Sequence, residues 1–230
     1  MNKLVAVLVP SGEHWHAQFG MSLISALSYL FLHGGGTGFV VRNKRGSILP
    51  QLREKLVEDT FRDVPGVTHF LFVDSDQTFP PETIVRLLEH DQPVVALNIP
   101  IKRLPSNPTA RRKGRAGEPE VVFSTPTSPK LGEVWRIGMG VVLLRADVFL
   151  RLPKPWFCVS WREEVGDFEG EDWWFCRRLE EARIPILVDH RLSLEVGHVG
   201  AYKFTHEDVA DGEYSRDSQA VCAGALPAGT

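Results

Sequence analysis

Cysteines are scarce in this 230-residue sequence: Cys158, Cys176 and Cys222 are the only three, and they lie far apart. An odd number at such spacing makes neither a disulfide framework nor the paired pattern of a zinc site, which indicates a reduced, cytosolic protein. Long apolar runs are also lacking. The run at residues 4–9 is too short for a membrane span or a signal-peptide core, so no membrane anchor is expected.

The sequence has no strong charge of either sign and no visible internal repeat. Its formal net charge of -3 argues against a protein coated in basic charge for nucleic acid, but net charge does not report local patches. The length suffices for one sizeable α/β domain with its own core.

The most informative stretch that is present runs from Thr68 to Asp76 and reads Thr-His-Phe-Leu-Phe-Val-Asp-Ser-Asp. Its apolar run is typical of a strand buried on both faces of a parallel sheet. Asp74 and Asp76 would point the same way if the extended form continues, at the sheet edge where α/β proteins bind ligands. Two interpretations remain open: a divalent-metal site that holds a diphosphate, or a solvated acidic turn.

Apolar segments of strand and helix type follow one another along the chain, which favours an α/β fold. Strands are expected at residues 4–9, 39–42, 70–73, 93–98, 121–123, 133–144 and 186–189, with a further alternating segment at 192–196. Helices are expected at residues 18–32, 47–61, 80–90, 146–150 and 171–182. Residues 99–119 and 154–168 are expected to be loops, and the end of the chain a mobile or lid-like tail.

Several charged groups have both a structural and a functional interpretation. The loop at 99–119 is rich in Lys and Arg, and it is either a solvated mobile loop or a grip for a polyanion. Glu171 and Asp172 begin a helix, where the helix dipole alone explains acidic residues. His198 would be structural if it acted alone, and Arg53 matters only if it faces the Asp pair. Gly138 and Gly140 within a strand mark a bulge or a close approach of a ligand.

Three signals occur in a fixed order: Asp-Ser-Asp at a strand end, Gly-Glu-Asp at a helix start, and Gly-His near residue 198. Together they resemble the GT-A-fold nucleotide-sugar glycosyltransferases, in particular small single-domain members from phages and bacteria. The stretches at 46–53, 68–81, 138–145 and 170–179 are similar to motifs of that family. The resemblance implies a single Rossmann-like domain over residues 1–205, with a mostly parallel central sheet and helices on both faces, followed by a tail at 206–230.

The resemblance also implies roles for individual residues. The donor would be bound by Pro10, Ser11, Arg53, Asp74, Ser75 and Asp76, with a UDP-sugar as the expected donor. Asp76 and His198 would bind Mn2+ or Mg2+ together with the diphosphate. Asp172 would accept the proton of the attacking hydroxyl, with Glu171 as the second candidate, or would only orient the acceptor in a retaining enzyme.

The acceptor is inferred from the basic loop and from tryptophans available for stacking. The favoured acceptor is the 5-hydroxymethyl group of a modified pyrimidine in phage-type DNA, reached by base flipping or through the major groove. Its expected contacts are Arg111, Arg112, Lys113, Gly138, Met139 and Trp173. The alternatives are a saccharide or lipid-linked acceptor, and a non-catalytic nucleotide-sugar or nucleic-acid binding module. A cytoplasmic location is expected, in the host if the protein is viral; sugar, stereochemistry and oligomeric state are left open.

Overall fold

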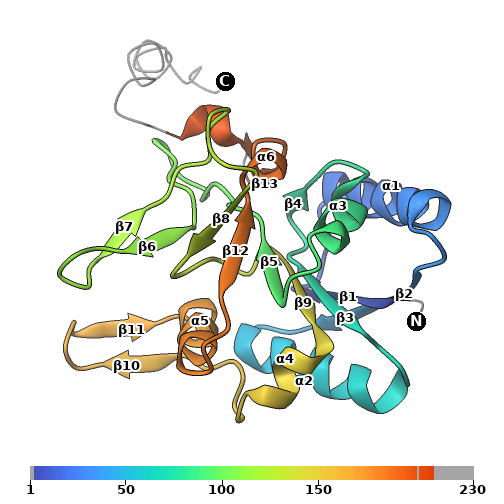
Figure 1. Ribbon diagram of the computed structural model, residues 1–230, viewed down its shortest axis with the longest axis horizontal. Helices are drawn as coiled ribbons and strands as arrows, with labels where there is room; N and C mark the ends of the chain where they lie inside the picture. The colour runs from blue at the N-terminus through green and yellow to red at the C-terminus, as the bar shows by residue number, and fades with distance from the viewer. Residues whose placement is uncertain (1–2, 201, 210–230) are drawn as a thin grey trace, which may run out of the picture.

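A seven-stranded sheet forms the centre of the protein in a computed structural model that describes residues 3–200 and 202–209 (Figure 1). The strand order is β2-β1-β3-β9-β5-β12-β8. The strands are β1 (Leu4–Ser11), β2 (Gly38–Arg45), β3 (His69–Val73), β5 (Val94–Ala96), β8 (Leu131–Val134), β9 (Val141–Arg145) and β12 (Ile186–Asp189). All run in one direction except β9, which lies between β3 and β5, and the edge strand β8. The predicted mostly parallel α/β sheet is confirmed.

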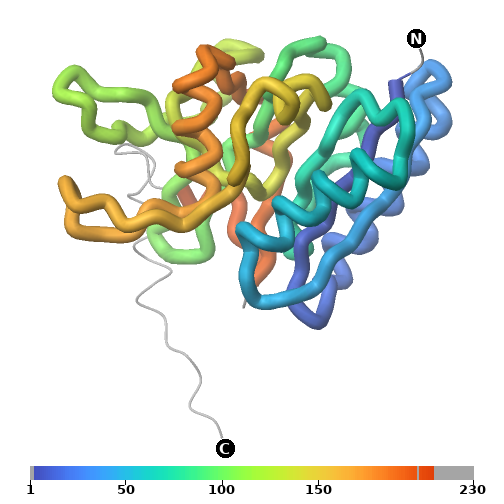
Figure 2. The backbone as a smooth tube through the Cα atoms, turned by 90° about the horizontal axis from the view of Figure 1, so that it is seen from below, coloured from blue at the N-terminus to red at the C-terminus, as the bar shows by residue number. Residues whose placement is uncertain are grey.

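Helices cover both faces of the sheet, as predicted (Figures 1 and 2). One face packs against α1 (Ala17–His33), α3 (Thr83–Glu89) and α6 (His190–Ser193), and the other against α2 (Leu49–Asp63), α4 (Ala146–Arg151) and α5 (Glu171–Glu181). Side chains of β3 contribute to the hydrophobic cores on both faces of the sheet, because successive side chains of a strand point to opposite faces. Phe70 and Phe72 face the α2 side, whereas Leu71 and Val73 face the α1 side.

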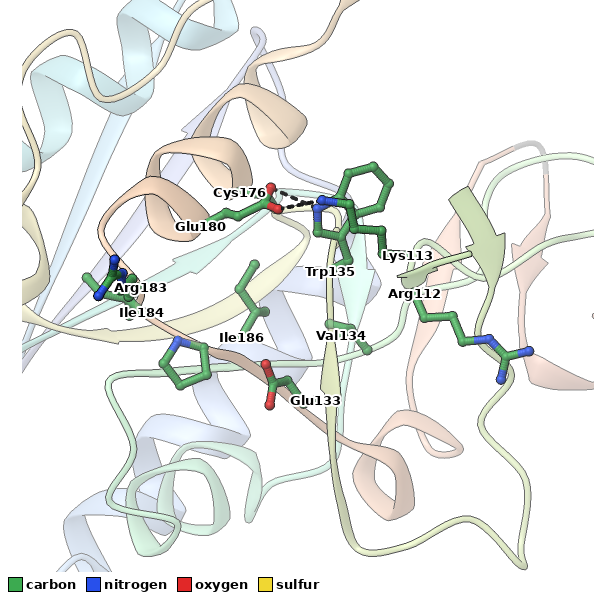
Figure 3. Close-up of a pocket in the computed structure, with 11 residues that line it drawn as sticks. Arg112, Lys113, Glu133, Val134, Trp135, Cys176, Glu180, Arg183, Ile184 and Ile186 are labelled. Atoms are coloured by element: carbon green, nitrogen blue, oxygen red, sulfur yellow. Dashed lines mark hydrogen bonds and ion pairs between the residues drawn. The ribbon is translucent and has the colours of Figure 1, made fainter. Parts of the chain in front are cut away.

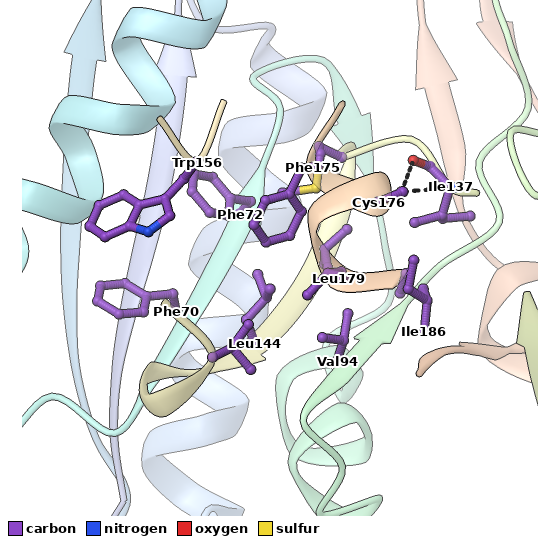
Figure 4. Close-up of a cluster of buried hydrophobic side chains, with 14 of the residues drawn as sticks. Phe70, Phe72, Val94, Ile137, Leu144, Trp156, Phe175, Cys176, Leu179 and Ile186 are labelled. Atoms are coloured by element: carbon purple, nitrogen blue, oxygen red, sulfur yellow. Dashed lines mark hydrogen bonds between the residues drawn. The ribbon is translucent and has the colours of Figure 1, made fainter. Parts of the chain in front are cut away.

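Aromatic rings fill the core on the α2 side (Figure 4). The ring of Phe149 lies 5.3 Å from that of Phe70, 5.2 Å from Trp156 and 5.7 Å from Phe175, measured between centroids. Each such ring pair contributes about 0.5–1.5 kcal/mol beyond its buried area. The cluster therefore fixes α5 against β3, which matters because both elements carry predicted site residues.

Two segments that were expected to be loops contain hairpins. Residues 99–119 contain β6 (Arg111–Lys113), which pairs with β7 (Pro119–Val121). Residues 154–168 contain β10 (Ser160–Arg162), and β11 (Asp167–Glu169) completes the second hairpin. Gly117 and Gly166 have φ values of +90° and +65°, which only glycine adopts readily, and so permit the turns. Both hairpins project on the left of Figure 1.

The single strand expected at 133–144 is wrong, because this segment supplies two separate strands. β8 lies at the sheet edge, while β9 lies in the centre, and residues 135–140 connect them. The extended segment expected at 192–196 is also wrong. The side chain of Asp189 accepts a hydrogen bond from Leu192 N at 2.8 Å and starts α6, since an Asp cap favours a helical turn over the local apolar alternation.

The described chain also forms a small second sheet. It consists of β4 (Gln77–Thr78), β13 (Gly197–Val199) and β14 (Lys203–Phe204), and a short 3-10 helix, η1 (His206–Asp208), comes after it. Ser106 N donates to Asp208 O at 2.8 Å, so the start of the expected tail docks on the loop after β5. The rest of that tail, 210–230, lies outside the described residues. Within the described part of the chain, Cys158 and Cys176 are free thiols, and no helix is both long and apolar enough to cross a bilayer.

Candidate functional site

The turn at Asp74–Asp76 is held by backbone hydrogen bonds from three other segments. Asp74 N donates to Gly140 O at 3.0 Å, while Ser75 O accepts from His16 N at 3.0 Å. Asp76 O accepts from Val199 N at 2.8 Å. The strand ends at Val73, so the two carboxylates do not continue an extended chain as the sequence suggested. All three residues of the turn nevertheless line one pocket.

This pocket has a volume of about 220 Å³ and opens where β1 and β3 end. It collects the predicted donor residues from the β1 end, the Asp turn and β13. Three segments also contribute residues that sequence reasoning did not assign to the site: Gly12 after the β1 end, Gly46 and Ser47 before α2, and Leu49 and Leu52 in α2. The lining residues are Pro10, Ser11, Gly12, Gly46, Ser47, Leu49, Leu52, Asp74, Ser75, Asp76 and His198.

Asp76 and His198 meet in this pocket, as the resemblance implied. His198 Nε2 lies 3.4 Å from Asp76 Oδ1, and His198 Nδ1 lies 3.0 Å from Pro100 O. Because a carbonyl oxygen only accepts, Nδ1 carries a proton, and Nε2 can then bond the carboxylate only through a second proton or a bound cation. Two electron-rich groups in contact need a proton or a cation between them. An imidazole anchored through Nδ1 is also the usual arrangement of a metal-binding histidine.

Lys102, which the sequence placed in the basic loop but not among the predicted site residues, also reaches this carboxylate. Its Nζ forms an ion pair with Asp76 Oδ2. Burial raises the pKa of Asp76, but hydrogen bonds from His198 and Lys102 outweigh burial and hold the pKa at about 2. Asp76 is therefore ionised at neutral pH. No group of three or more His, Cys, Asp or Glu side chains suited to a metal occurs among the described residues, so a cation here would have two protein ligands and would need others from its substrate.

Arg53 lies beneath the pocket rather than in its lining. Its side chain is 2% exposed, Nη2 donates to Asp74 Oδ1 at 2.9 Å, and Nε donates to Glu171 Oε1 at 3.3 Å. Burial raises the pKa of Asp74, against the opposing effect of the Arg53 charge. The end of Arg53 thus faces the Asp pair, and the three groups link α2, β3 and α5.

Asp172 follows Glu171 in the first turn of α5. Its Oδ1 accepts a hydrogen bond from Trp173 N at 2.8 Å. Burial, and then the negative charge of Glu171, raise its pKa to about 6. A carboxyl group that titrates near neutral pH is suited to general-base chemistry. Asp172 does not line the Asp74–Asp76 pocket but is connected to it through Glu171 and Arg53.

The expected acceptor residues lie elsewhere in the fold, and the pocket lining contains none of them. Arg112 pairs with Glu120 at 2.6 Å and Lys113 with Glu180 at 3.1 Å. Arg111 donates to two backbone carbonyls, those of Pro108 and Ala110. Met139 is buried in the core, Gly138 packs against Thr109, and the ring of Trp173 lies 6.4 Å from that of Trp135.

A larger cavity of about 540 Å³ lies between α5, β8 and β12 (Figure 3). Glu180 accepts hydrogen bonds there from Trp135 Nε1 at 2.8 Å and from Arg136 at 2.9 Å, besides its pair with Lys113. Burial raises the pKa of Glu180, but these three partners outweigh it and hold the pKa at about 2. The polar groups around Glu180 therefore bind one another. This cavity shares no lining residue with the Asp74–Asp76 pocket.

Comparison with known proteins supports the fold. No family model matches the chain, and no curated protein matches its sequence. The solved structure of A197 from STIV is 18% identical, with a TM-score of 0.52 over 87% of this chain and 86% of that one. The catalytic domain of Drosophila β1,4-galactosyltransferase 7 with xylobiose is 12% identical, with a TM-score of 0.49 over 86% of this chain and 71% of that one.

A mutant of the same Drosophila enzyme, in complex with manganese, UDP-Gal and xylobiose, gives a TM-score of 0.48 at 12% identity over the same shares of the two chains. At these identities the likeness concerns the fold alone. The chain shares its α/β fold with A197, and its mostly parallel sheet with helices on both faces agrees with the fold that the sequence resemblance implied.

Proposed function

We propose that this protein is a metal-dependent glycosyltransferase, which moves a sugar from a nucleotide-sugar donor to a hydroxyl acceptor. The observation that carries the proposal is the pair formed by Asp76 and His198 at the carboxyl edge of the sheet. The imidazole Nε2 faces an ionised carboxylate at 3.4 Å, an arrangement that a divalent cation would complete. The motif resemblance and the GT-A fold support the same activity.

Asp76 and His198 would hold Mn2+ or Mg2+, and a carboxylate with an imidazole suits Mn2+ better than Mg2+, which prefers oxygen ligands. When bound, the cation would neutralise charge on the departing diphosphate. Pro10 and Ser11 would hold the nucleoside of a UDP-sugar, and Asp74 with Ser75 its ribose and diphosphate. Arg53 would act through Asp74, since it orients that carboxylate from below the pocket.

Asp172 is the proposed general base. Glu171 already binds Arg53, whereas Asp172 has the raised pKa that lets a carboxylate accept a proton from the attacking hydroxyl. Such a base contributes about 10²–10⁴-fold in rate. In a retaining reaction the same residue would orient the acceptor instead.

The test of this proposal is the metal dependence of donor cleavage. The purified protein is incubated with a panel of UDP- and GDP-sugars and Mn2+, and release of the nucleoside diphosphate is followed with and without EDTA. Activity should require the metal and should be lost in Asp76→Ala, while Glu163→Ala, an exposed acid outside the pocket, should match the wild type. Activity that survives EDTA, or wild-type turnover in Asp76→Ala, would refute the metal role.

For the acceptor, the proposal from the basic loop is a hydroxymethylated pyrimidine in phage-type DNA. The ion pairs of Arg112 and Lys113 count against it, because DNA phosphates would have to replace Glu120 and Glu180. That observation favours a saccharide acceptor as the second candidate. A cytoplasmic location is part of the same proposal and rests on the widely spaced cysteines.

Nucleoside mass analysis distinguishes these acceptors. Hydroxymethylated DNA and a panel of glycans are offered with each donor, and the products are examined for the mass of one added sugar. Replacing Arg111, Arg112 and Lys113 together by Ala should weaken DNA binding and flatten its salt dependence. Transfer to a glycan with no gain on any nucleoside would end the DNA proposal.

A further inference from the structure

Helix α1 is a surface helix without a single charged side chain. Its 17 residues include no Asp, Glu, Lys or Arg, although one side of the helix faces solvent. Met21, Ile24, Phe31 and Leu32 are 64%, 59%, 78% and 71% exposed, respectively. They recur at the spacing that places side chains on one helix face. A second set of apolar residues on α1 is buried against the sheet, so the exposed set is not needed for the core.

Two side chains of the neighbouring edge strand extend this surface. Phe39 and Val41 of β2 share one face of the strand, and Phe39 lines a hollow of about 420 Å³ with α1 residues. We call Met21, Ile24, Phe31, Leu32, Phe39 and Val41 the charge-free patch. With exposed fractions of 36–78%, these six side chains form an apolar surface larger than the few hundred Å² that monomeric proteins rarely exceed. In Figure 1, α1 and β2 lie together at the right-hand border of the molecule.

We propose that the charge-free patch is the contact surface between two copies of this chain. A standard interface takes about 800 Å² from each partner, so the patch with a polar rim has the size that a stable dimer needs. Residues close to a two-fold axis lie near their own copies, so ionised side chains there would face like charges. A helix free of all four charged residue types avoids that repulsion.

The chemistry of the patch disfavours two other modes of contact. Helices that lie on a bilayer surface have Lys and Arg on their polar face, and α1 has none. Continuation of the sheet across the free edge of β2 is opposed by Arg42, Lys44 and Arg45, since charged residues protect edge strands from pairing. The contact is therefore packing of α1 against α1, flanked by Phe39 and Val41.

The charge-free patch is separate from the proposed catalytic pocket. The residues that line the Asp74–Asp76 pocket and those of the charge-free patch have no member in common. The proposal is thus independent of the proposed function, and loss of association does not require loss of donor cleavage.

Sedimentation velocity of the full chain, from about 0.1 to about 100 µM, tests the dimer. The wild type should reach twice the chain mass at the upper concentrations. Phe31→Glu should raise the dissociation constant at least about 100-fold, because each copy would bury an ionised group against its partner. Leu150→Glu is the matched control: Leu150 is 75% exposed on α4, outside the patch, and its variant should associate like the wild type.

Thermal unfolding shows whether Phe31→Glu folds. If it does not, the same sedimentation experiment is made with Ile24→Lys. A wild type that remains monomeric throughout the range overturns the proposal, and so does a folded Phe31→Glu or Ile24→Lys that still associates like the wild type. A monomer that floats with phosphatidylcholine vesicles overturns it in favour of a bilayer surface.

Discussion

Replacing Asp172 by Asn should stabilise the folded protein while it abolishes transfer. The variant keeps an oxygen for the hydrogen bond from Trp173 N but removes the charge that burial and Glu171 disfavour. The pKa of Asp172 is about 6 in the folded chain, against an ordinary value of 3.8. Between these pH values the folded state binds a proton that the unfolded chain has released. The free energy of unfolding therefore falls as pH rises through this window.

The magnitude follows from the shift of about two pKa units. At about 1.4 kcal/mol per unit, ionised Asp172 costs the folded state up to about 3 kcal/mol at pH 8, and less to the extent that its side chain is solvated. Urea unfolding of the wild type and Asp172→Asn should show the variant about 1–3 kcal/mol more stable at pH 8 and equal to the wild type near pH 4. Glu163→Gln, at an exposed position, is the control for loss of a negative charge.

A variant that is no more stable than the wild type at pH 8 would refute the reasoning, because the charge of Asp172 would then not destabilise the folded state.

The pKa of Asp172 also predicts how activity depends on pH. As a base with a pKa of about 6, Asp172 should make kcat/KM fall about tenfold per pH unit below that value. Asp172→Asn should bind donor normally, and loss of donor binding would assign the residue a different role.

Three further substitutions test the contacts around the site and the core. Arg53→Met leaves Asp74 and Glu171 without their shared counter-charge and should destabilise the protein by about 3–5 kcal/mol in urea unfolding; a loss below about 1 kcal/mol would contradict the pairing. Lys102→Met frees Asp76 Oδ2 and should raise the affinity for Mn2+ about two- to fivefold, the range for a partly exposed ion pair, as measured by electron paramagnetic resonance of unbound Mn2+. An unchanged affinity would show that Lys102 does not compete with the cation. Phe149→Ala removes the centre of the aromatic cluster and should cost about 3–5 kcal/mol by thermal unfolding, whereas Leu150→Ala next to it, which is exposed, should cost little.

The sheet and the Asp pocket could be predicted because their signals are local. The apolar run before Asp74 identifies a buried strand, and parallel strands present their carboxyl ends at one edge. Pro10, Ser11 and His198 line the same pocket, and they were assigned to it through the resemblance rather than through a local signal. The helical turn before β13 was missed, because residues 192–196 alternate like a strand.

Pairings between distant residues could not be predicted. Glu171 is separated from Arg53 by 118 positions, and their contact depends on how α5 packs on β3 through Phe149 and Phe175. The basic loop was expected to be either a solvated loop or a grip for a polyanion, yet Lys113 forms an ion pair with Glu180 at the C-terminal end of α5. Composition alone does not report which acidic residue will lie next to each cation.

The ion pairs of Arg53 with Asp74 and Glu171 have a consequence for the evolution of this chain. The arginine cannot be replaced alone, because its loss leaves two carboxylates without a counter-charge, whereas loss of one acid leaves a matched ion pair. A change at position 53 should therefore be accompanied by a change at position 74 or 171 among homologous sequences. A lineage that lost the arginine would be expected to show a neutral residue in place of at least one acid.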